Sequence, residues 1–396
     1  MTNIRKKIVF VGLSGGVDSA VSAALLKKQG YEVVGVFIKT WHPEFIVCNE
    51  EQERIDSMRV AATLDIPFLT FDFEDVYKKE VADYMIQEYK LGRTPNPDVM
   101  CNKEVKFGAF LKKALSMGAD FVATGHYALK KDSSKFFPGP RFSGSLSRPD
   151  HVKNIEESFL LKGKDFTKDQ SYFLWTLRQE QLKRILFPIG NLKKTEVRKL
   201  AKKFKLPVSE KKDSQGICFL GAVDLKEFLK HYIKEKKGKV LNEKGEEIGF
   251  HNGVVFYTLG ERHGFTVTKK TPIDRAYYVV GKNIKKNILY VSQQKNFVNF
   301  STLLHPTGGT FRSKNFQNSF VDLNNINWIN KIPEQNKTYT AQIRYHGEFL
   351  PCTIKAEGLE RSRRAKVIFT KPILVASGQS CVIYDGDVCL GGGVVV

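Results

Sequence analysis

Residues 8–29 read IVFVGLSGGVDSAVSAALLKKQ, in which an apolar run passes through a glycine-rich turn into a helical pattern. The run at 8–13 predicts a buried strand, and 17–29 predicts a helix. The same alternation continues, with further strands predicted at 33–38, 67–72 and 121–124 and helices at 51–64 and 104–117. Apolar strands separated by helices are typical of a parallel sheet covered on both faces. The N-terminal part is therefore predicted to be an α/β domain with a doubly wound parallel sheet.

The rest of the chain predicts two smaller β-rich units. After helical patterns at 170–186 and 195–204 come short strand-like segments broken by glycine, among them 253–259, and Asp385-Gly386 predicts a hairpin turn. We expect an α/β domain over 1–210 with a helical extension, a central β-rich domain over 211–276 and a C-terminal β-barrel over 277–396. Residues 132–158 are rich in Ser, Pro and Gly without periodicity, which predicts a mobile surface insertion.

Composition points to a protein that meets a polyanion. The chain has 396 residues, with 63 Lys and Arg against 42 Asp and Glu, and a formal net charge of +21. Such a balance favours nucleic acid as a partner, although simple solubility would explain part of it. The basic segment 193–212 holds nine Lys or Arg against two Glu, and we interpret it as an RNA-facing patch. No apolar run is long enough for a membrane span and no cleavable leader pattern is present, so we expect a cytoplasmic protein without a membrane partner.

The glycine-rich turn itself, Ser14-Gly15-Gly16-Val17-Asp18-Ser19, carries chemistry. It lies where a strand ends and a helix begins, a place where backbone N–H groups and the helix N-terminus can cradle phosphate. It lacks the lysine of a Walker A loop and is not a GxGxxG motif. The six residues are similar to the pyrophosphate loop of N-type ATP pyrophosphatases, which cleave ATP between the α and β phosphates. The alternative is a structural strand-to-helix turn capped by a serine.

Two of the six cysteines lie in segments that suggest reactivity. Cys101 follows an Asn-Pro-Asp turn and directly precedes a helical pattern, where Lys103 and the helix start would lower the thiol pKa and Asp98 would be near enough to move a proton. Cys218 lies in a second glycine-containing loop, DSQGICFLG at 213–221. No pair has the C-x-x-C spacing of zinc or redox motifs. For the others we expect buried, unreactive side chains: Cys48, Cys352, Cys381 and Cys389.

Together these segments resemble one enzyme family, the tRNA-specific 2-thiouridylases. The resemblance rests on GLSGGVDS from Gly12, GRTPNPDVMCNKEVKFG from Gly92, TGHYA from Thr124, KDQSYFLW from Lys168, and DSQGICFLG. It continues to GQS and DGDVCLGGG near the C-terminus, and so it covers almost the whole chain. Departures are the 132–158 insertion and a glutamine at position 215, where threonine is commoner.

The resemblance implies an adenine nucleotide alpha hydrolase-like domain and specific site residues. ATP, with Mg²⁺, would be bound by Gly12, Leu13, Ser14, Gly15, Gly16, Val17, Asp18, Ser19, Ile38 and Gly125. The target base would be contacted by Asn96, Pro97 and Asp98. Further tRNA contacts would come from His126, Lys168, Asp169, Gln170, Arg344, Tyr345 and Gln379. Taken singly, several of these also suit structural roles: His126 as a strand-end cap, Lys168 and Asp169 as a solvated helix start, and Arg344-Tyr345 as a strand pair.

The resemblance also implies a reaction, ATP-dependent 2-thiolation of the wobble uridine in the anticodon loop of tRNA. The uridine C2 oxygen would be adenylated, and a persulfide on Cys218, with Cys101 as its partner and Asp98 beside it, would deliver sulfur. A sulfur-relay protein or a cysteine desulfurase would supply the persulfide. Alternatives are a related enzyme such as lysidine synthetase or an amidotransferase, and a non-catalytic RNA-binding protein. An iron–sulfur cluster held by Asp98, Cys101 and Cys218 ranks second to the cluster-free route.

Overall fold

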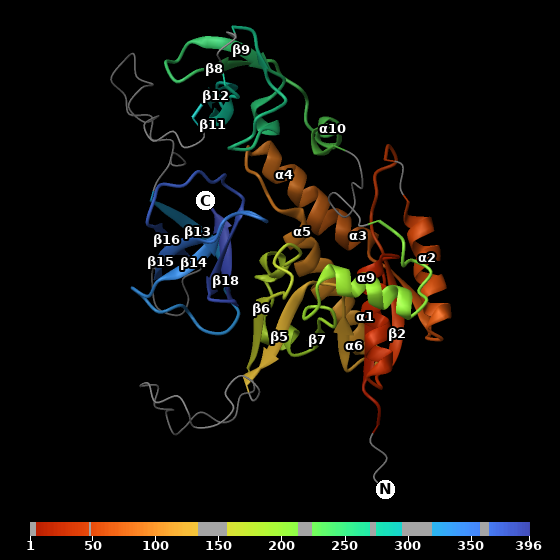
Figure 1. Cartoon of the computed structure of the whole chain (residues 1–396). Coiled ribbons are helices and arrows are strands. Elements are labelled where there is room, and N and C mark those ends of the chain that lie inside the picture. Colours follow the sequence, from red (N-terminus) through yellow and green to blue (C-terminus); the bar gives the residue numbers. More distant parts are fainter. Residues whose placement is uncertain are drawn as a thin grey trace.

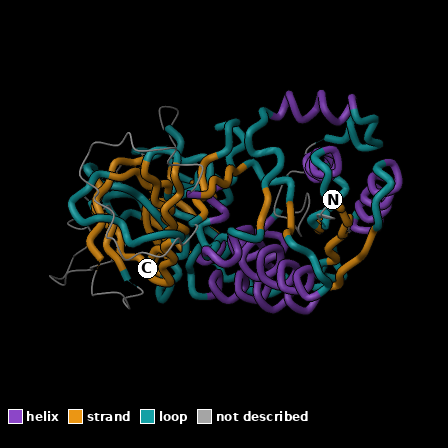
Figure 2. The backbone as a smooth tube through the Cα atoms, turned by 90° about the horizontal axis from the view of Figure 1, so that it is seen from below, coloured by secondary structure: helices purple, strands orange, loops and turns teal. Residues whose placement is uncertain are grey.

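The strands among the described residues form three β-sheets, which Figure 1 shows as three groups of strands. The computed structural model describes residues 5–46, 49–133, 157–212, 224–269, 275–294, 319–356 and 364–396. In the view of Figure 2, the strands of the C-terminal sheet lie at one end of the molecule, and the strands of the N-terminal sheet lie toward the other end. None of the helices in the described part of the chain combines the length and apolar composition that crossing a bilayer requires.

The N-terminal domain contains the predicted parallel sheet. Its strands, in spatial order, are β3 (Phe68–Asp72), β2 (Glu32–Lys39), β1 (Ile8–Gly12), β4 (Phe121–Ala123) and β7 (Ile185–Leu186). All four neighbouring pairs run parallel. Because β1 lies between β2 and β4, the order reverses at the carboxyl end of β1, which is where open α/β sheets bind ligands.

Helices cover both faces of this sheet, as the alternation within β1 requires. Val9 and Val11 pack in one apolar cluster and Phe10 in another. The valine side is covered by α1 (Val17–Lys28), α2 (Glu50–Thr63) and α9 (Lys194–Lys203). The phenylalanine side is covered by one continuous helical run, α5 (Pro97–Met100), the π-helical stretch η2 (Cys101–Phe110) and α6 (Leu111–Ser116). The prediction of a doubly wound sheet is confirmed.

The helix predicted over 170–186 is wrong. The segment forms a short 3-10 turn, η3 (Ser171–Leu174), one turn of helix, α8 (Gln179–Leu182), and the edge strand β7. Tertiary contacts override the helical pattern here, because the Tyr172 hydroxyl donates to the Ser380 carbonyl at 3.0 Å and Trp175 Nε1 donates to Ser380 Oγ at 3.1 Å. Both aromatic rings are thereby held against the C-terminal barrel.

The central domain has a mixed five-stranded sheet, preceded by α10 (Leu225–Lys230). Its order is β10 (Thr266–Val267), β9 (Glu247–His251), β8 (Gly238–Leu241), β12 (Ile288–Ser292) and β11 (Tyr278–Asn283). Residues 254–256, inside a segment predicted to be strand-like, form the 3-10 turn η4 (Val254–Phe256) instead. The core of this domain is shared with a helical run of the N-terminal domain: α3 (Glu74–Tyr77), η1 (Lys78–Asp83) and α4 (Tyr84–Lys90).

The predicted C-terminal β-barrel is confirmed. Its strands are β13 (Phe320–Trp328), β16 (Ala365–Phe369), β15 (Leu350–Ala356), β14 (Tyr339–Gln342), β17 (Ser380–Asp385) and β18 (Val388–Val395), and the pairing of β13 with β18 closes the ring. Closure depends on a glycine, since a Cβ on Gly391 (φ +126°) would lie 2.0 Å from the Asn327 carbonyl oxygen. The β17–β18 hairpin turns at Gly386 and Asp387, one residue later than predicted.

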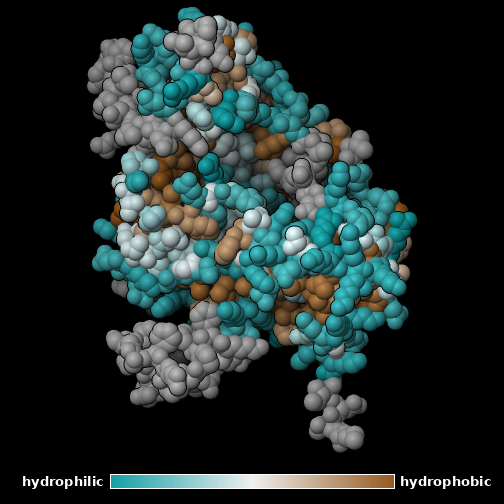
Figure 3. Space-filling model, viewed as in Figure 1, coloured by the Kyte–Doolittle hydropathy of each residue, from teal (hydrophilic) through white to brown (hydrophobic). Residues whose placement is uncertain are grey.

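A hairpin from the N-terminal domain extends the barrel sheet. Strands β5 (Ala128–Asp132) and β6 (Ser158–Lys162) pair antiparallel, and β6 also pairs with β18. Asp132 pairs with Ser158, so the two ends of the predicted 132–158 insertion lie side by side, while residues 134–156 lie outside the described residues. In Figure 3, the side of the N-terminal domain that carries α9 is covered mostly by hydrophilic residues.

Candidate active site

The glycine-rich turn has the shape of a phosphate cradle at the carboxyl end of β1. The Ser14 N–H donates to Ser19 Oγ at 3.2 Å, and the two hydroxyls lie 3.3 Å apart, so the loop closes on the first turn of α1. Gly15 has φ +67°, and a Cβ there would come within 2.6 Å of the Glu53 carbonyl oxygen. Gly16 is the N-cap and offers no side chain to the first N–H groups of α1. Those groups suit an anion such as a nucleotide phosphate.

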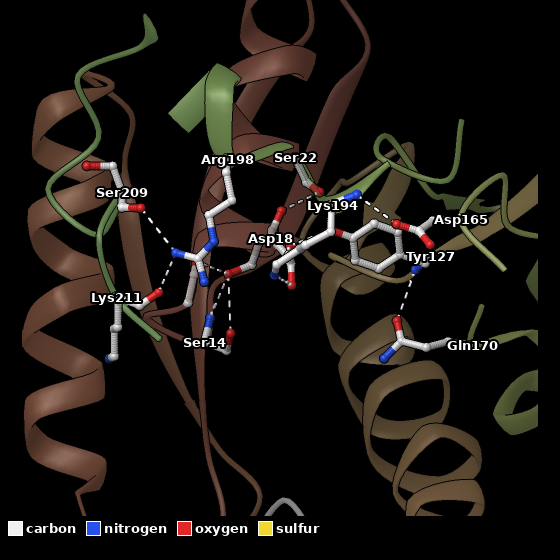
Figure 4. Close-up of polar contacts among 12 residues, drawn as sticks. Ser14, Asp18, Ser22, Tyr127, Asp165, Gln170, Lys194, Arg198, Ser209 and Lys211 are labelled. Atoms are coloured by element: carbon white, nitrogen blue, oxygen red, sulfur yellow. Dashed lines mark hydrogen bonds and ion pairs between the residues drawn. The ribbon is translucent and has the colours of Figure 1, made fainter. Parts of the chain in front are cut away.

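Asp18 is the charged centre of this loop, and a distant lysine neutralises it (Figure 4). Lys194 Nζ lies 2.8 Å from both Asp18 carboxylate oxygens, although 176 residues separate the two in sequence. The Tyr127 hydroxyl donates to Asp18 Oδ1 at 2.7 Å. Lys194 itself is fixed at the start of α9, where its backbone N–H donates to the Asp165 carboxylate at 2.9 Å and helps hold the pKa of Asp165 below its usual value.

Sequence reasoning missed Lys194 as a site residue. It lies in the basic segment 193–212, which the sequence analysis interpreted only as an RNA-facing patch. Part of that charge faces inward: besides Lys194, Arg198 donates to the carbonyls of Ser209 and Lys211 (Figure 4). Six of the nine basic residues are exposed, namely Lys193, Lys199, Lys202, Lys203, Lys205 and Lys212. Only that subset is available to a nucleic acid.

The residues predicted to bind ATP converge at this sheet edge. Gly125 follows β4 and packs directly on α1, since a Cβ there would come within 2.7 Å of the Ser19 nitrogen and 2.8 Å of the Asp18 carbonyl carbon. The Leu13 N–H donates to Val36 O at 2.7 Å, which extends the pairing of β1 and β2 up to the loop. Ile38, near the carboxyl end of β2, is half-buried at the same edge. The predicted ATP residues therefore lie together at one edge of the sheet, some of them buried beneath the loop.

Asn96, Pro97 and Asp98 form the start of the helix that carries Cys101. Asn96 is the N-cap, and its side-chain oxygen accepts the backbone N–H groups of Asp98 and Val99 at 3.1 and 3.2 Å. Pro97 occupies the first helical position, where its missing N–H is not needed. Asn102 Nδ2 donates to the Asp98 carbonyl at 3.0 Å. The base-contacting residues predicted for the family are thus held by a well-capped helix start.

Cys101 lies inside this helix rather than before it, which corrects the prediction. The helical run begins at Pro97, four residues earlier than the thiol. Cys101 is 3% exposed and packs in the same apolar cluster as Tyr77, Met85 and Val105. The Lys103 ammonium, expected beside the thiol, lies 2.7 Å from the Glu104 carboxylate. In this conformation the thiol is enclosed, so any reaction at Cys101 requires the surrounding side chains to part.

Two residues predicted to touch tRNA are buried. His126 is 6% exposed, its Nδ1 lies 2.7 Å from Thr124 Oγ1, and its ring packs against Phe107 and Phe187. Burial, with the Lys106 charge, lowers the pKa of His126 well below its ordinary value, so the ring is neutral. Asp169 accepts the backbone N–H groups of Gly163 and Ser171 at 2.8 and 3.1 Å, while burial raises its pKa.

The N-terminal domain and the C-terminal barrel meet at Asp169. A pocket of about 150 Å³ is lined by Lys162, Phe166, Asp169, Gln342, Tyr345 and His346, so that residues of the N-terminal domain face residues of the barrel. The Tyr345 ring lies 4.4 Å from that of Phe173, and burial beside the Asp169 and Asp98 carboxylates raises the pKa of Tyr345 to about 12. Lys168 is half-buried beside this pocket, and Arg344 lies in the turn that leads to it, its carbonyl accepting the Gly347 N–H at 2.9 Å.

Gln170 and Gln379 support other site segments. Gln170 Oε1 accepts the Tyr127 backbone N–H at 3.0 Å, which places it behind the tyrosine that bonds Asp18 (Figure 4). Gln379 Nε2 donates to the Thr94 carbonyl at 2.9 Å, in the loop that leads to Asn96. The Gln170 contact supports Tyr127 beside the phosphate loop, and the Gln379 contact supports the segment that leads to Asn96.

Comparison with known proteins identifies the chain. Residues 7–222 match the tRNA methyl transferase HUP domain, 226–293 the tRNA methyl transferase PRC-barrel domain and 319–395 the aminomethyltransferase beta-barrel domain. A tRNA-specific 2-thiouridylase MnmA from Streptococcus thermophilus is 41% identical over 402 residues, covering 100% of this chain and 96% of that protein. The chain belongs to the tRNA-specific 2-thiouridylase family. A relative with the same name from Listeria monocytogenes is also 41% identical, covering 98% of this chain and 94% of that protein.

Solved structures add little to this identification. The U34-tRNA thiolase NcsA from Methanococcus maripaludis, solved with its [4Fe-4S] cluster, is 16% identical and covers 58% of this chain and 64% of its own, with a TM-score of 0.32. A likeness this low supports no inference about chemistry. Membership of the thiouridylase family rests on the full-length sequence relatives.

Of the two cysteines that the resemblance implies as a pair, only Cys101 lies among the described residues. Cys218 and Cys48 lie outside the described residues, and so the predicted approach of Cys218 to Cys101 stays a prediction. Cys352, Cys381 and Cys389 are buried in the barrel, and burial raises the pKa of each thiol, to about 12 for Cys352. High thiol pKa values agree with the unreactive role predicted for these three.

Metal binding can be examined only over the described residues. Within those ranges no group of three or more His, Cys, Asp or Glu side chains could hold a metal ion. The predicted iron–sulfur ligand set includes Cys218, outside these ranges, and therefore stays a prediction. Asp18 and the hydroxyls of Ser14 and Ser19 are hard oxygen donors of the same loop, and donors of this kind suit Mg²⁺ that accompanies a nucleotide.

Proposed function

We propose that the chain catalyses ATP-dependent 2-thiolation of the wobble uridine of tRNA, releasing AMP and pyrophosphate. The observation that carries this proposal is the joining of two features in one domain. One is a phosphate loop centred on Asp18 and Lys194, and the other is a capped helix that presents Asn96, Pro97 and Asp98 next to Cys101. Membership of the 2-thiouridylase family over the full chain supports the same reaction.

In the activation step, the C2 oxygen of uridine forms a bond to the α phosphorus of ATP, and the bond to the β-phosphate oxygen breaks. Residues Gly12–Ser19, Ile38 and Gly125 bind the nucleotide, and Asp18 would hold Mg²⁺, which neutralises phosphate charge. Lys194, held beside Asp18 at the phosphate loop, would place its ammonium near the departing pyrophosphate. A preorganised cation at the point where negative charge develops favours this step without reorganisation of solvent.

In the transfer step, sulfur replaces the adenylated oxygen. The terminal sulfur of a Cys218 persulfide attacks C2 of the activated base, and AMP leaves. The Cys101 thiolate then attacks Cys218 Sγ, which breaks the S–S bond, leaves the sulfur on the base at the sulfide level, and forms a Cys101–Cys218 disulfide. A thiol reductant restores the pair, and Asp98 takes up the proton of the Cys101 thiol. A persulfide-carrying protein, either a sulfur-relay protein or a cysteine desulfurase, reloads Cys218.

The described residues around position 218 support this pairing. Lys211 is anchored by its ion pair with Asp56 at 2.8 Å, and after Asp224 the helix α10 places Phe228 in the same apolar cluster as Cys101. Cys218 is midway between the described residues Lys212 and Asp224, so it can extend at most roughly 20 Å from either.

The target base must leave the anticodon stack to reach this site. Unstacking costs a few kcal/mol and is least costly in a single-stranded loop, which favours the anticodon. The exposed lysines of 193–212, and the pocket shared by Asp169 and Tyr345, would bind the flanking tRNA. The net charge of +21 agrees with a polyanionic substrate.

Mass spectrometry of nucleosides tests the proposal directly. Uridine-34-containing tRNA is incubated with the protein, ATP and a persulfide donor, and the digested nucleosides are analysed together with the nucleotide products. We expect 2-thiouridine, AMP and pyrophosphate in equal amounts. Formation of ADP and phosphate would contradict the activation step, and a product with lysine or ammonia in place of sulfur would favour the related enzymes. Iron content and a visible spectrum of anaerobically purified protein test the cluster-dependent alternative.

A further inference from the structure

The segment that leads to Asn96 starts at a turn that lies against the central domain. Helix α4, which ends at this turn, lies next to the central domain in Figure 1 and shares its core. The Gly92 N–H donates to the Tyr89 carbonyl at 2.8 Å and closes the helix. Gly92 has φ +73°, and a Cβ at this position would overlap the side chain of Ile284, which follows β11. Glycine therefore allows the turn to approach the central domain closely.

Lys282 joins this turn to the central domain. It lies in β11, and its Nζ donates to the Gly92 carbonyl at 2.8 Å and to the Tyr257 carbonyl at 2.6 Å. Gly92 belongs to the N-terminal domain, whereas Tyr257 directly follows η4 of the central domain. One ammonium group therefore holds main-chain atoms of two domains at a fixed separation.

The Lys282 ammonium lies in surroundings that disfavour its charge. Burial lowers the pKa of Lys282 to about 8, although the nearby Glu261 carboxylate opposes that shift. Removing a charged group from water costs free energy, which hydrogen bonds recover only in part. An apolar side chain would avoid this cost but could not hold the two carbonyls. The directional bonds to Gly92 and Tyr257, rather than burial of the side chain, therefore explain a lysine here.

The surroundings of the turn leave it room to shift. A pocket of about 180 Å³ lies beside Lys282 and is lined by residues of all three domains, among them Leu91, Leu259 and Ser377. Because this space adjoins Gly92, apolar packing alone does not fix the position of the turn. The hydrogen bonds of Lys282 supply that constraint.

A second contact from the central domain reaches the same segment further along the chain. Thr94 is buried, and its hydroxyl lies 3.2 Å from Thr258 Oγ1. The Thr258 N–H donates to the Glu261 carboxylate at 2.9 Å, and the Val279 N–H in β11 donates to the Glu261 carbonyl at 2.9 Å. Residues 257–261 are thus tied to the strand that carries Lys282.

From Thr94 the constraint passes to the residues proposed to contact the target base. Only Pro95, whose ring restricts φ, separates Thr94 from Asn96. The Asn96 side-chain oxygen caps the helix by accepting the Asp98 N–H. A shift of the turn at Gly92 would therefore move Asn96 and Asp98 with it.

We propose that Lys282 is a positioning residue for thiolation, which together with Thr258 makes the central domain the support that sets the segment 96–98 against the target base. The inference rests on the proposed function, in which this segment contacts the uridine. In this role Lys282 acts through the Gly92 carbonyl rather than by touching uridine or ATP. The rate of thiolation therefore depends on how the central domain holds the turn.

The variant Lys282→Met tests this role, because methionine has a similar length and cannot donate a hydrogen bond. The single-turnover rate of thiolation, at saturating tRNA and ATP, should fall roughly 10- to 100-fold, since a small displacement of a reacting group has an effect of this size. The affinity for tRNA, measured by filter binding without ATP, should stay within about twofold of wild type, because phosphate contacts supply most of it. Thr258→Val, which keeps the shape of the side chain, should lower the rate in the same way.

A matched control is Asn287→Gly. Asn287 Nδ2 also donates to two carbonyls, those of Lys236 and Lys237 at 2.9 and 3.0 Å, but both of these lie in the central domain. Glycine readily adopts the φ of +52° found at this position, so the variant removes the side-chain bonds without straining the backbone. Asn287→Gly should lower the melting temperature and leave the rate of thiolation unchanged.

All variants are assayed well below their melting temperatures. If Lys282→Met melts at a lower temperature but thiolates at the wild-type rate, Lys282 only joins the two domains and the proposal is overturned. Weaker tRNA binding with a full rate at saturating tRNA would overturn it as well, because Lys282 would then contribute to binding. If Lys282→Met does not fold, a wild-type rate in Thr258→Val overturns the proposal and a reduced rate supports it. Absence of 2-thiouridine with the wild-type protein would instead refute the proposed function.

Discussion

Replacing Lys194 by methionine removes the cation of the phosphate loop and little else. Lys194 Nζ lies 2.8 Å from both oxygens of Asp18, with the two side chains 15% and 31% exposed. Because the pair is neither fully exposed nor fully buried, its loss should destabilise the protein by about 1–3 kcal/mol, between the values for surface and buried pairs. If Lys194 also meets the leaving pyrophosphate, ATP cleavage should slow roughly 100- to 1000-fold, as for loss of one preorganised donor.

Single-turnover release of pyrophosphate in the presence of tRNA measures this effect, at a temperature well below the melting point of the variant. A control is Lys337→Met, which breaks a 2.7 Å ion pair with Asp385 in the barrel and should leave pyrophosphate release unchanged. The affinity for tRNA should be unaffected in both. If Lys194→Met melts at a lower temperature but cleaves ATP at the wild-type rate, Lys194 is only a structural partner of Asp18, and its role in activation is refuted.

Three further predictions concern other parts of the molecule. Cys101→Ser and Cys218→Ser should each stop thiolation but spare tRNA binding, and peptide mapping after one turnover without reductant should find the two cysteines cross-linked; robust thiolation by Cys101→Ser would contradict the pair. Affinity for tRNA should fall steeply with salt, by about 0.7 to 0.9 log units per phosphate contact per log unit of salt, and reversing the charges of Lys202 and Lys203 should weaken it without changing ATP binding. Burial lowers the pKa of His126 in the folded protein, so the unfolded state binds an extra proton as the pH falls below about 6.5, and the free energy of unfolding decreases. His126→Asn should reduce this decrease between pH 6.5 and 5, which is at most roughly 1.4 kcal/mol per pH unit. If calorimetry gives both proteins the same dependence of unfolding free energy on pH, this prediction is disproved.

Local patterns predicted the parallel sheet well because each strand and helix carries its own signal. The apolar run before the glycine-rich turn becomes β1, and Val17 begins α1 as predicted. Prediction failed where tertiary contacts outweigh periodicity. The 170–186 segment has a helical pattern, but Tyr172 and Trp175 bond to Ser380 in the barrel, more than 200 positions away, and the chain bends to reach it.

The sequence predicted those residues of the candidate site that lie in a contiguous motif, but not those that reach the site only through the tertiary fold. Residues Ser14 to Ser19 are contiguous, and their sequence alone indicates a phosphate loop. Lys194 resembles the other lysines of a basic helix in sequence, and only the packing of α9 against α1 places it beside that loop. The sequence analysis counted the charge of Lys194 correctly but did not predict that its side chain turns inward, toward Asp18. A signal was present, since α9 is amphipathic and its buried Val197 and Ala201 fix which side faces the sheet.

The same distinction explains why the accessory domains escape a motif-based view of the site. Among the described residues, neither the central sheet nor the barrel contributes a side chain to the phosphate loop, yet Thr258, Ser377 and Gln379 together occupy the polar groups of Thr94. If the segment 96–98 contacts the target base, as proposed, the base has to enter beside it, and packing on that side is then not available to stabilise the loop. Stabilisation of Thr94 by the two accessory domains does not depend on that side of the loop. It also makes the position of Asp98 depend on how the barrel is seated, which a domain cut away at residue 210 would lose.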